Sequence, residues 1–532
     1  MKVDGTVTRD QTRSGSSAWP SSHEGNRLPG LTILYHPDLE RVGERTVLEG
    51  LDTARGAALS RKAPEFAIPG STVGAARPLD DNRISRQALI LRRRDGAIHV
   101  DKSESKTRLS VDGNTIERAT SVPENDLARG VVLLLGERIV LLLHFLDPIA
   151  DTTTPRFGLV GESPAMVRLR RDVVQTADLD VTLLLRGESG TGKEVVAQAI
   201  HQAGPRRERP LVAVNMAAVP TALAAAELFG AEKGAYTGAD RRRAGHFERA
   251  RGGTLFLDEI GETPPEVQTM LLRTLETGEI QPVGSERVER PNVRVISATD
   301  ADLEAAIDDD RFRSPLLHRL SGYVIHLPPL RERREDFGRL FVFFLRRELE
   351  ALGLLRHYSG RWLPASLVAR LAAWHWPGNV RQLANTVRQL VIANRDAERA
   401  QRFEAIERLL GNESSTAVPT ARGDSAQEEP PRQEPPPGPR RPSDLREEEI
   451  VAALKAYRFR PAAAADALGI PRSSIYDLIA KIPSLRKAND LEREEIEAAC
   501  AREGPSLEAV AAALEVSERA LRRRMGELNI SF

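Results

Sequence analysis

A glycine-rich stretch that contains one lysine is the feature of this sequence best suited to chemistry. The apolar run VTLLL ends at residue 185, and the helix-forming sequence EVVAQAIHQ begins at residue 194. The residues that matter between them are Gly187, Glu188, Ser189, Gly190, Thr191, Gly192 and Lys193. The glycines let the backbone wrap a polyphosphate with its amides inward, the helix N-terminus adds positive potential, and the lysine reaches the outer phosphates. A chance Gly-rich turn is the alternative, but the strand before it and the helix after it favour an ATP site.

Two adjacent carboxylates, Asp258 and Glu259, follow another apolar run, TLFL. Open α/β sheets bind their ligands at the C-terminal ends of the strands. We therefore expect Asp258 to hold Mg²⁺ and Glu259 to polarise the attacking water. Glu194 stands where Ser or Thr usually ligates the metal, so metal binding depends on other residues. An acidic helix cap is the alternative, and the phosphate loop in the same region favours catalysis over it.

The elements that must position these residues alternate along the chain. The buried runs VTLLL, LVAVN, TLFLD and VRVISA are each followed by helix-compatible sequence, which predicts a parallel sheet with helices on both faces. Strand signals stop near Pro328, and amphipathic helical sequence continues to about Leu410 as a lid. Upstream, short β-type runs separated by turn residues predict an all-β domain, in which 131–146 forms two buried strands joined by a tight turn.

The C-terminal part contains an internal repeat with an offset of 46 residues, so that Ile450 and Leu468 align with Ile496 and Leu514. Each copy reads as a helix, a helix rich in small residues, a short turn and a further helix, which is the layout of a helix-turn-helix. A stretch rich in Pro, Glu, Ser and Gln precedes the repeat and cannot form a core. The predicted segments are a disordered tail at 1–30, a β-sandwich at 31–150, an α/β ATPase subdomain at 157–328, a helical lid at 329–410, a Pro-rich linker at 411–443, and helix-turn-helix units at 444–486 and 490–532.

Composition sets the broad class. The 532 residues are 41% hydrophobic and 29% charged, which is typical of globular protein with several domains. The 76 basic and 76 acidic residues balance, so a nucleic-acid surface must come from local clustering. The single cysteine, Cys500, excludes an intramolecular disulfide framework and fits a reducing compartment. With neither a secretory signal nor an apolar run long enough to span a bilayer as a helix, the sequence predicts a cytoplasmic protein without a membrane partner.

Residues from about Phe157 to Leu410 closely resemble the AAA+ domain of NtrC-type, sigma-54-dependent activators. GESGTGKE, ELFGAEKGAYTGA, GGTLFLDEIGE, LPPLRER and WPGNVRQL occur in that family's order and spacing, and Glu194 is itself usual there. The resemblance implies an ATPase that uses ATP and Mg²⁺, assembles as a homo-hexamer, binds enhancer DNA and remodels RNA polymerase carrying sigma-54.

The resemblance also assigns roles to single residues. Asn215 matches the switch residue that holds the catalytic glutamate, and Arg381 matches the lid arginine that senses the γ-phosphate. Arg313 and Arg319 match the paired arginines that reach into the nucleotide of the neighbouring subunit, where they would stabilise charge on the transferred phosphoryl group. The chain departs from the family's usual pattern in the segment SPLLH between these arginines, which includes Pro315, and at Asp300, where Asn or His is more usual.

The loop that this family uses to grip sigma-54 is the most discriminating element. It comprises Gly234, Ala235, Tyr236, Thr237, Gly238 and Ala239. Its usual Phe is Tyr here, which keeps the aromatic ring and adds a hydroxyl. A simple surface hairpin, which is the alternative, leaves the aromatic residue unexplained.

The C-terminal units resemble the Fis-type helix-turn-helix of the same activators. In the second unit one helix carries basic residues suited to phosphates and guanine edges: Arg519, Arg522, Arg523 and Arg524. The first unit has Arg472, Ser473 and Ser474 at the corresponding positions, and it either reads DNA or only packs and dimerises. A basic solvated helix face is the alternative.

The N-terminal β region weakly resembles a forkhead-associated domain, a sandwich that binds phosphothreonine peptides. Gly74, Ser85, Arg86 and the segment SVDGNTI match parts of the pattern. Ala75, Ala88 and Thr107 replace the expected Arg, His and Asn. An interaction sandwich that has lost the phosphothreonine site and a working phosphothreonine reader both remain open.

Two other classes of protein share parts of this pattern. A general AAA+ remodeller needs the ATP site but not the loop at 234–239 or the DNA-binding helices. A DNA-binding repressor that uses ATP as an assembly signal needs the helices but not a moving loop.

Overall fold

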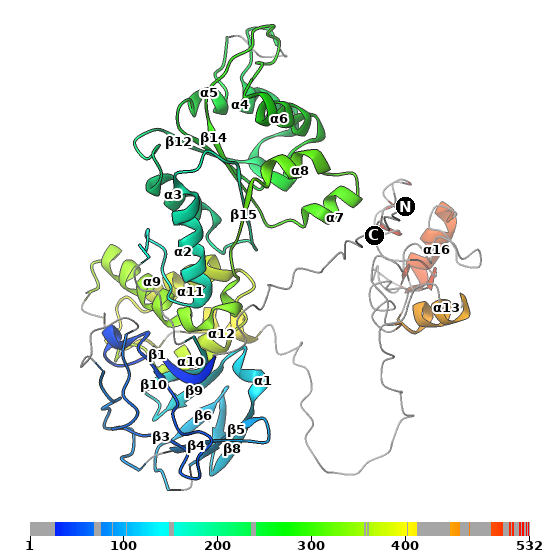
Figure 1. The fold of residues 1–532 in the computed structure, drawn as a ribbon. Coiled ribbons are helices and arrows are strands. Elements are labelled where there is room, and N and C mark those ends of the chain that lie inside the picture. Colours follow the sequence, from blue (N-terminus) through cyan, green and yellow to red (C-terminus); the bar gives the residue numbers. More distant parts are fainter. Residues whose placement is uncertain are drawn as a thin grey trace, which may run out of the picture. The chain divides into compact units, whose positions relative to one another are not determined.

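The computed structural model describes two compact units, residues 1–417 and 418–532. The described residues are 27–68, 76–87, 89–102, 104–147, 154–235, 241–355, 358, 361–401, 403–411, 447–457, 468, 491–503, 510, 511, 513, 514, 516, 521, 522, 524, 525, 528 and 530. The first unit contains three parts, which Figure 1 colours from blue to yellow along the chain. No helix within the described ranges is both long and apolar enough to cross a bilayer.

The first part is a β-sandwich. A six-stranded sheet has the order β2-β1-β10-β9-β6-β7, and a four-stranded sheet has the order β3-β4-β5-β8. The strands are β1 Leu28–Tyr35, β2 Arg45–Val47, β3 Ala57–Leu59, β4 Leu89–Arg94, β5 Ala97–Asp101, β6 Leu109–Val111, β7 Asn114–Ile116, β8 Ala119–Pro123, β9 Val131–Leu135 and β10 Ile139–Leu146, with the short helices η1 Leu39–Arg41 and α1 Glu124–Leu127. The predicted all-β domain is confirmed, and so is the pair of strands within 131–146. These two strands pair antiparallel across a turn in which Gly136 and Glu137 both have positive φ.

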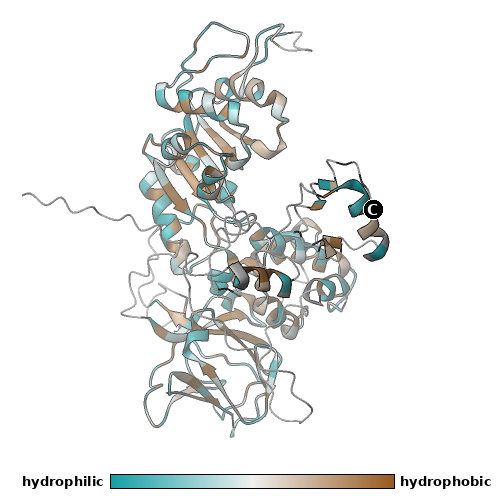
Figure 2. Cartoon of the chain, turned by 90° about the vertical axis from the view of Figure 1, so that its right-hand side faces the viewer, coloured by the Kyte–Doolittle hydropathy of each residue, from teal (hydrophilic) through white to brown (hydrophobic). Residues whose placement is uncertain are grey.

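The largely apolar character of β9 and β10 has a physical cause, since both faces of these strands are buried. Leu133 and Leu141 point into the core between the two sheets. Their neighbours Val132, Val140 and Leu142 belong instead to a core shared with the helical lid. Successive residues of a strand point to opposite faces, so each strand serves two cores at once. Figure 2 shows hydrophobic colour on strands of the sandwich.

The second part is the α/β ATPase subdomain. Its five strands are parallel and lie in the order β12-β13-β14-β11-β15. The elements are α2 Pro164–Ala177, β11 Leu183–Arg186, α3 Lys193–Ala203, β12 Leu211–Asn215, η2 Met216–Ala218, η3 Thr221–Leu223, α4 Ala224–Phe229, α5 His246–Arg249, β13 Thr254–Asp258, η4 Ile260–Glu262, α6 Pro265–Thr277, β14 Arg294–Thr299, α7 Leu303–Asp308, α8 Ser314–Leu320 and β15 Tyr323–His326.

Hydrophobic cores lie on both faces of this sheet, as the alternation of strands and helices predicted. Leu183 and Leu185 of β11 pack with α2 and α3, whereas Leu184 packs with α4 to α8. The fifth strand, β15, was missed from the sequence. It has only four residues and pairs with one neighbour, so its pattern is too short to read alone.

The third part is the lid. It contains η5 Leu330–Glu332, η6 Arg334–Asp336, α9 Phe337–Ala351, α10 Ala365–Ala373, α11 Asn379–Ala393 and α12 Glu404–Gly411. Its helices enclose Trp362 and Trp376, each 2% exposed, together with side chains from β1, β9 and β10 of the sandwich. The sandwich and the lid therefore share one core at their boundary.

The second unit is described in part, as α13 Glu447–Ala456, α16 Arg493–Glu503 and scattered positions beyond. Leu491, Ile496, Val510, Leu514 and Leu521 are buried together. Cys500 is partly buried against this cluster. The predicted turns and most of the two predicted recognition helices lie outside the described residues, so the helix-turn-helix assignment stays a prediction.

A buried carboxyl at the boundary of sandwich and lid predicts a pH effect. Burial and Asp336 raise the pKa of Glu335 from 4.5 to about 8, against the opposing effect of Arg45. The folded chain therefore favours the protonated carboxyl below about pH 8. The stability of the folded chain falls as pH rises from about 4.5 through about 8, where this proton is lost. We expect Glu335→Gln to melt about 5 °C higher than the parent at pH 8.5 but close to it at pH 4.5, by differential scanning fluorimetry. Melting curves that stay parallel across this range contradict the prediction.

Candidate nucleotide site

The glycine-rich stretch forms a loop between β11 and α3, as predicted. Gly190 and Gly192 have φ of +79° and +108°, a conformation that side chains other than glycine rarely adopt. Lys193 is largely buried, and its Nζ donates to the Gly187 carbonyl at 2.8 Å. The Thr191 hydroxyl donates to the Glu188 carbonyl at 2.8 Å, while Glu194 is exposed on the first turn of α3. The loop thus presents its backbone at a helix N-terminus, which suits phosphate oxygens.

The paired carboxylates lie at the C-terminal end of β13. Glu259 has φ of +52°, and its amide donates to Asp258 Oδ1 at 3.1 Å. Burial and a hydrogen bond shared with Asp300 raise the pKa of Glu259, whereas Lys193 acts in the opposite direction. Asp300 directly follows β14, so the unusual residue noted in the sequence contacts the predicted catalytic carboxyl.

Asn215 ends β12 in register with Asp258 of the neighbouring strand. Its side chain accepts a hydrogen bond from the Ala217 amide at 2.9 Å, and so caps η2. The strand pairing brings Asn215 to the same edge of the sheet as the two carboxylates. Its role as a switch stays a prediction.

The lid closes on the phosphate loop through α11. Arg381 Nη1 donates to the Ser189 hydroxyl at 2.8 Å, and its amide donates to the Gly190 carbonyl at 3.2 Å. A Cβ at Gly190 would lie 2.5 Å from the Gly378 carbonyl oxygen, so glycine is required for this approach. The predicted γ-phosphate sensor therefore lies beside the phosphate loop.

Asn379 of the WPGNVRQL motif has a part that the sequence did not indicate. It is fully buried, with φ of +51°. Its Nδ2 donates to Glu188 Oε2 and to the Ser189 carbonyl, both at 3.1 Å, and its Oδ1 accepts from the Leu330 amide at 2.8 Å. Asn379 thus ties the phosphate loop to the lid. The sequence signal for this role was a polar residue, Asn379, within a family motif. Only the fold shows that this residue is buried.

Two arginines of the LPPLRER motif were also not singled out from the sequence. Arg331 forms a two-pronged pair with Glu188 at 2.7 and 2.5 Å, and this pair lowers the pKa of Glu188. Arg333 Nη2 donates to the Thr191 carbonyl at 3.2 Å. The motif therefore supports the phosphate loop from the lid side.

Arg313 and Arg319 lie at the two ends of α8, and both are exposed. The Arg313 amide donates to the buried Gln268 Oε1 at 2.9 Å. The Arg319 carbonyl accepts from Thr182, which precedes β11, whereas the phosphate loop follows that strand. Five residues of extended chain span about 16 Å, so the backbone of Arg319 lies at the opposite end of β11 from the phosphate loop. Its side-chain Nε donates to the Leu275 carbonyl at 2.9 Å. Pro315 is in the first turn of α8, where proline is readily accommodated.

The base of the predicted sigma-54 loop is described up to Ala235 and again from residue 241. Ala231 bridges Arg243 and also Val283, and Gly284 lies against Ala235. Tyr236, Thr237, Gly238 and Ala239 lie outside the described residues.

Several other predicted site residues also lie outside the described residues, namely Gly74, Ala75, Ala88, Arg472, Ser473, Ser474, Arg519 and Arg523. Arg522 is exposed, whereas Arg524 is partly buried and donates to the Leu491 carbonyl at 3.2 and 3.1 Å. In the sandwich, the buried Thr107 accepts hydrogen bonds from the Ser85 amide at 2.9 Å and from Ser105 at 3.2 Å. Thr107 therefore packs within the sandwich and organises the segment around Ser85.

A parallel sheet, a phosphate loop, paired carboxylates at the adjoining strand end and a helical lid together define an AAA+ ATPase. Comparison with family models agrees with this class. Residues 159–326 match the Sigma-54 interaction domain, and residues 331–420 match the AAA+ ATPase lid domain.

Curated relatives narrow the class further. The chain is 47% identical over 238 residues to the DNA-binding transcriptional regulator NtrC of Escherichia coli (strain K12), covering 45% of this chain and 50% of that protein. It is 44% identical over 258 residues to the transcriptional regulatory protein ZraR of Klebsiella oxytoca, covering 46% and 55%. A crystal structure of NtrX from Brucella abortus in complex with ADP is 28% identical with a TM-score of 0.43, covering 71% of this chain and 70% of that one.

The central domains of the chain, residues 159–326 and 331–420, are those of NtrC-type, sigma-54-dependent activators. It spans about half the length of the curated relatives that it matches.

The buried position of Asn379 gives a testable consequence. Replacing it by glycine keeps the positive φ but removes three hydrogen bonds inside the protein. We expect Asn379→Gly to lower the free energy of unfolding by about 3 kcal/mol and to weaken ATP binding about tenfold. Asn379→Ala should be worse, since alanine is strained at positive φ. Urea unfolding and titration with a fluorescent ATP analogue measure the two effects. Lower stability with unchanged ATP affinity would leave Asn379 a purely structural residue.

Proposed function

We propose that this protein is an ATP-dependent transcription activator that binds enhancer DNA and remodels closed complexes of sigma-54 RNA polymerase into open ones. The observation that carries the proposal is an assembled nucleotide site inside the domain that matches the Sigma-54 interaction domain. The site joins the phosphate loop, the pair Asp258 and Glu259, and the lid residue Arg381.

Each residue of the site has a proposed part in hydrolysis. The loop amides and Lys193 bind the phosphates of ATP. Glu259 accepts a proton from the attacking water, and Arg381 reports on the γ-phosphate. Mg²⁺ is usually held by one or two carboxylates together with substrate phosphates, and Asp258 at the strand end fits that mode of binding. The metal would neutralise charge on the phosphates.

The placement of Arg319 supports catalysis across subunits. Arg319 is exposed and lies at the end of β11 remote from its own phosphate loop. An arginine supplied by a neighbour stabilises the charge of phosphoryl transfer and makes hydrolysis depend on assembly. We therefore propose that Arg313 and Arg319 complete the site of the next subunit in a homo-hexamer.

The remaining partners follow from the ends of the chain and from the loop at 234–239. The C-terminal helices would hold enhancer DNA, while hydrolysis moves Tyr236 and Thr237 against sigma-54. The sandwich would receive the input signal from a protein partner. A phosphothreonine-containing partner is the alternative. Thr107 is bonded within the sandwich, which favours a partner of another kind, whereas Ala75 and Ala88 lie outside the described residues.

Glu259→Gln separates ATP binding from hydrolysis. The amide cannot take the proton of the attacking water, so we expect the ATPase rate to fall at least about a hundredfold while ATP affinity is kept. Phosphate release and a fluorescent ATP analogue provide the measurements. Glu266→Gln, a like change at an exposed residue of α6, is the matched control. Undiminished hydrolysis by the Glu259 variant refutes its assignment.

Thr237→Ala distinguishes the activator from the two rival classes. Under the proposal it spares ATPase activity and DNA binding but abolishes sigma-54 binding in the presence of ADP and aluminium fluoride, measured on a native gel. A general remodeller or an ATP-assembled repressor would be unaffected by this change. Thr269→Ala, at an exposed position of α6, is the control. Absence of sigma-54 binding by the parent protein itself would reduce the assignment to an ATPase whose target is another molecule.

A further inference from the structure

The sandwich meets the lid at a contact that leaves no room for a side chain. Gly338 is the second residue of α9, and it is buried. A Cβ at this position would lie 2.4 Å from the Leu34 carbonyl oxygen and 2.8 Å from Leu34 Cα, both on β1. Backbone atoms cannot yield as a flexible side chain does. The approach of β1 to α9 therefore depends on this glycine.

Polar contacts fix the same boundary. Arg334 Nη1 donates to the Gly130 carbonyl at 2.7 Å, and its Nη2 donates to the Ala372 carbonyl of α10 at 3.0 Å. Arg339 Nη2 donates to the Gly43 carbonyl at 2.9 Å. The Tyr35 hydroxyl donates to the Leu363 carbonyl at 3.2 Å. All four acceptors are backbone carbonyls, so these contacts fix the position of the sandwich backbone relative to the lid.

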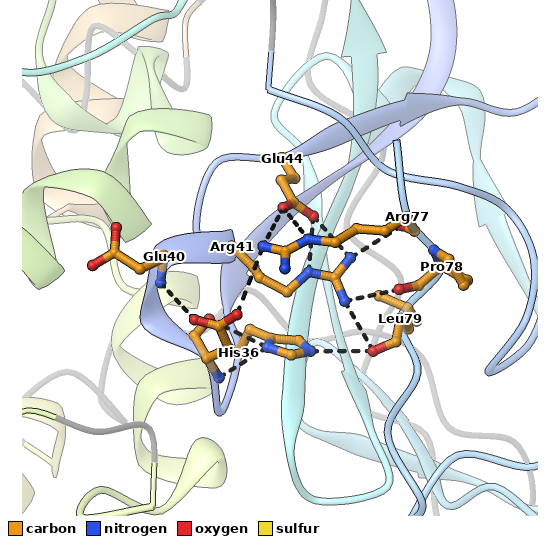
Figure 3. A network of polar contacts seen from close by, with 8 residues as sticks. His36, Glu40, Arg41, Glu44, Arg77, Pro78 and Leu79 are labelled. Atoms are coloured by element: carbon orange, nitrogen blue, oxygen red, sulfur yellow. Dashed lines mark hydrogen bonds and ion pairs between the residues drawn. The ribbon is translucent and has the colours of Figure 1, made fainter. Parts of the chain in front are cut away.

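The sandwich loop that receives Arg339 is itself held in place. Figure 3 shows Arg41 and Arg77 converging on the buried Glu44. Arg41 donates to Glu44 Oε2 at 2.9 and 2.8 Å, and also to the carbonyls of Pro78 and Leu79. The charge of each buried partner is compensated, which is the condition for a stable buried pair. Gly43 and Arg45 are thus presented to the lid on a braced loop.

The other side of the boundary leads directly to the nucleotide site. Residues 331–336, here called the junction segment, carry Arg331 and Arg333, which support the phosphate loop at Glu188 and Thr191. Arg334, the next residue, contacts the sandwich. Asp336 accepts from the Ser163 amide and hydroxyl at 3.0 and 2.6 Å, and so fixes the start of α2. Six consecutive residues therefore touch the sandwich, the phosphate loop and the ATPase subdomain.

We propose that the docked sandwich sets the position of the junction segment, and that Arg334 and Gly338 are positioning residues through which undocking of the sandwich weakens ATP binding. The inference rests on the proposed ATPase function but not on sigma-54 or DNA as partners. A change of affinity requires that ATP distinguish two positions of the lid, and contacts from the junction segment to the phosphate loop supply that difference.

Gly338→Ala in the full chain tests the proposal, because alanine is the better helix former and should stabilise α9 if nothing packs on it. Under the proposal it separates β1 from α9 instead. We expect a red shift of tryptophan emission, since Trp362 and Trp376 share the core with Leu34. We also expect ATP affinity to fall about fivefold or more, measured with a fluorescent ATP analogue. Glu350→Ala, an exposed position of the same helix, should change neither.

Arg334→Gln is the second variant, and it covers the case in which Gly338→Ala does not fold. The hydrogen bonds of the Arg334 side chain go to carbonyls of the sandwich and of α10. The substitution removes the guanidinium that donates to Gly130 and Ala372. The same red shift and loss of ATP affinity support the proposal. A red shift with unchanged or tighter ATP binding overturns it, as does unchanged emission in both variants. Failure of sigma-54 binding in every variant would count against the activator function and leave this result standing.

Discussion

The burial of β1, β9 and β10 on both faces is the constraint on which the arrangement of the first unit depends. A strand that is apolar at nearly every position cannot leave one face in water without exposing a large hydrophobic patch. One face is covered by the second sheet of the sandwich, and the other by α9 and α10 of the lid. The lid is therefore a structural component of the N-terminal domain as well as of the ATPase.

Burial also decides which contacts around the nucleotide site contribute most to stability. The pair between Arg331 and Glu188 is partly exposed, with 42% of each side chain accessible, so solvent screens it and its contribution is modest. Asn379 is fully buried with both ends of its amide bonded, and loss of such groups costs about 1–3 kcal/mol for each polar partner left unsatisfied. The position of the phosphate loop thus depends more on the buried amide than on the visible ion pair. The lid holds that amide in place, and the sandwich completes the core of the lid.

The sequence was sufficient for the parts of the fold that are specified locally. The phosphate loop, four of the five parallel strands and the pair β9 and β10 follow from apolar periodicity and glycine placement. The short edge strand β15 and the buried amide of Asn379 could not be predicted, because each is defined by a neighbour distant in sequence. The packing of Val132 and Val140 against the lid could not be predicted for the same reason. An apolar run shows that both faces of a strand are covered, but it does not show which element covers each face. Asp300 was recognised as unusual, and only the fold showed its contact with Glu259.

The geometry of β11 brings these observations together. The phosphate loop follows this strand and Thr182, which holds Arg319, precedes it, so the two halves of the proposed catalytic apparatus lie at opposite ends of one short strand. In the proposed hexamer, a subunit arranged in this way receives the arginine from its neighbour, and its nucleotide lies between two copies of the chain. Each copy then offers its neighbour an arginine from the ATPase subdomain, while its own phosphate loop is supported from the lid. Under these two proposals, regulation by the sandwich and activation by assembly act on the same nucleotide from different sides.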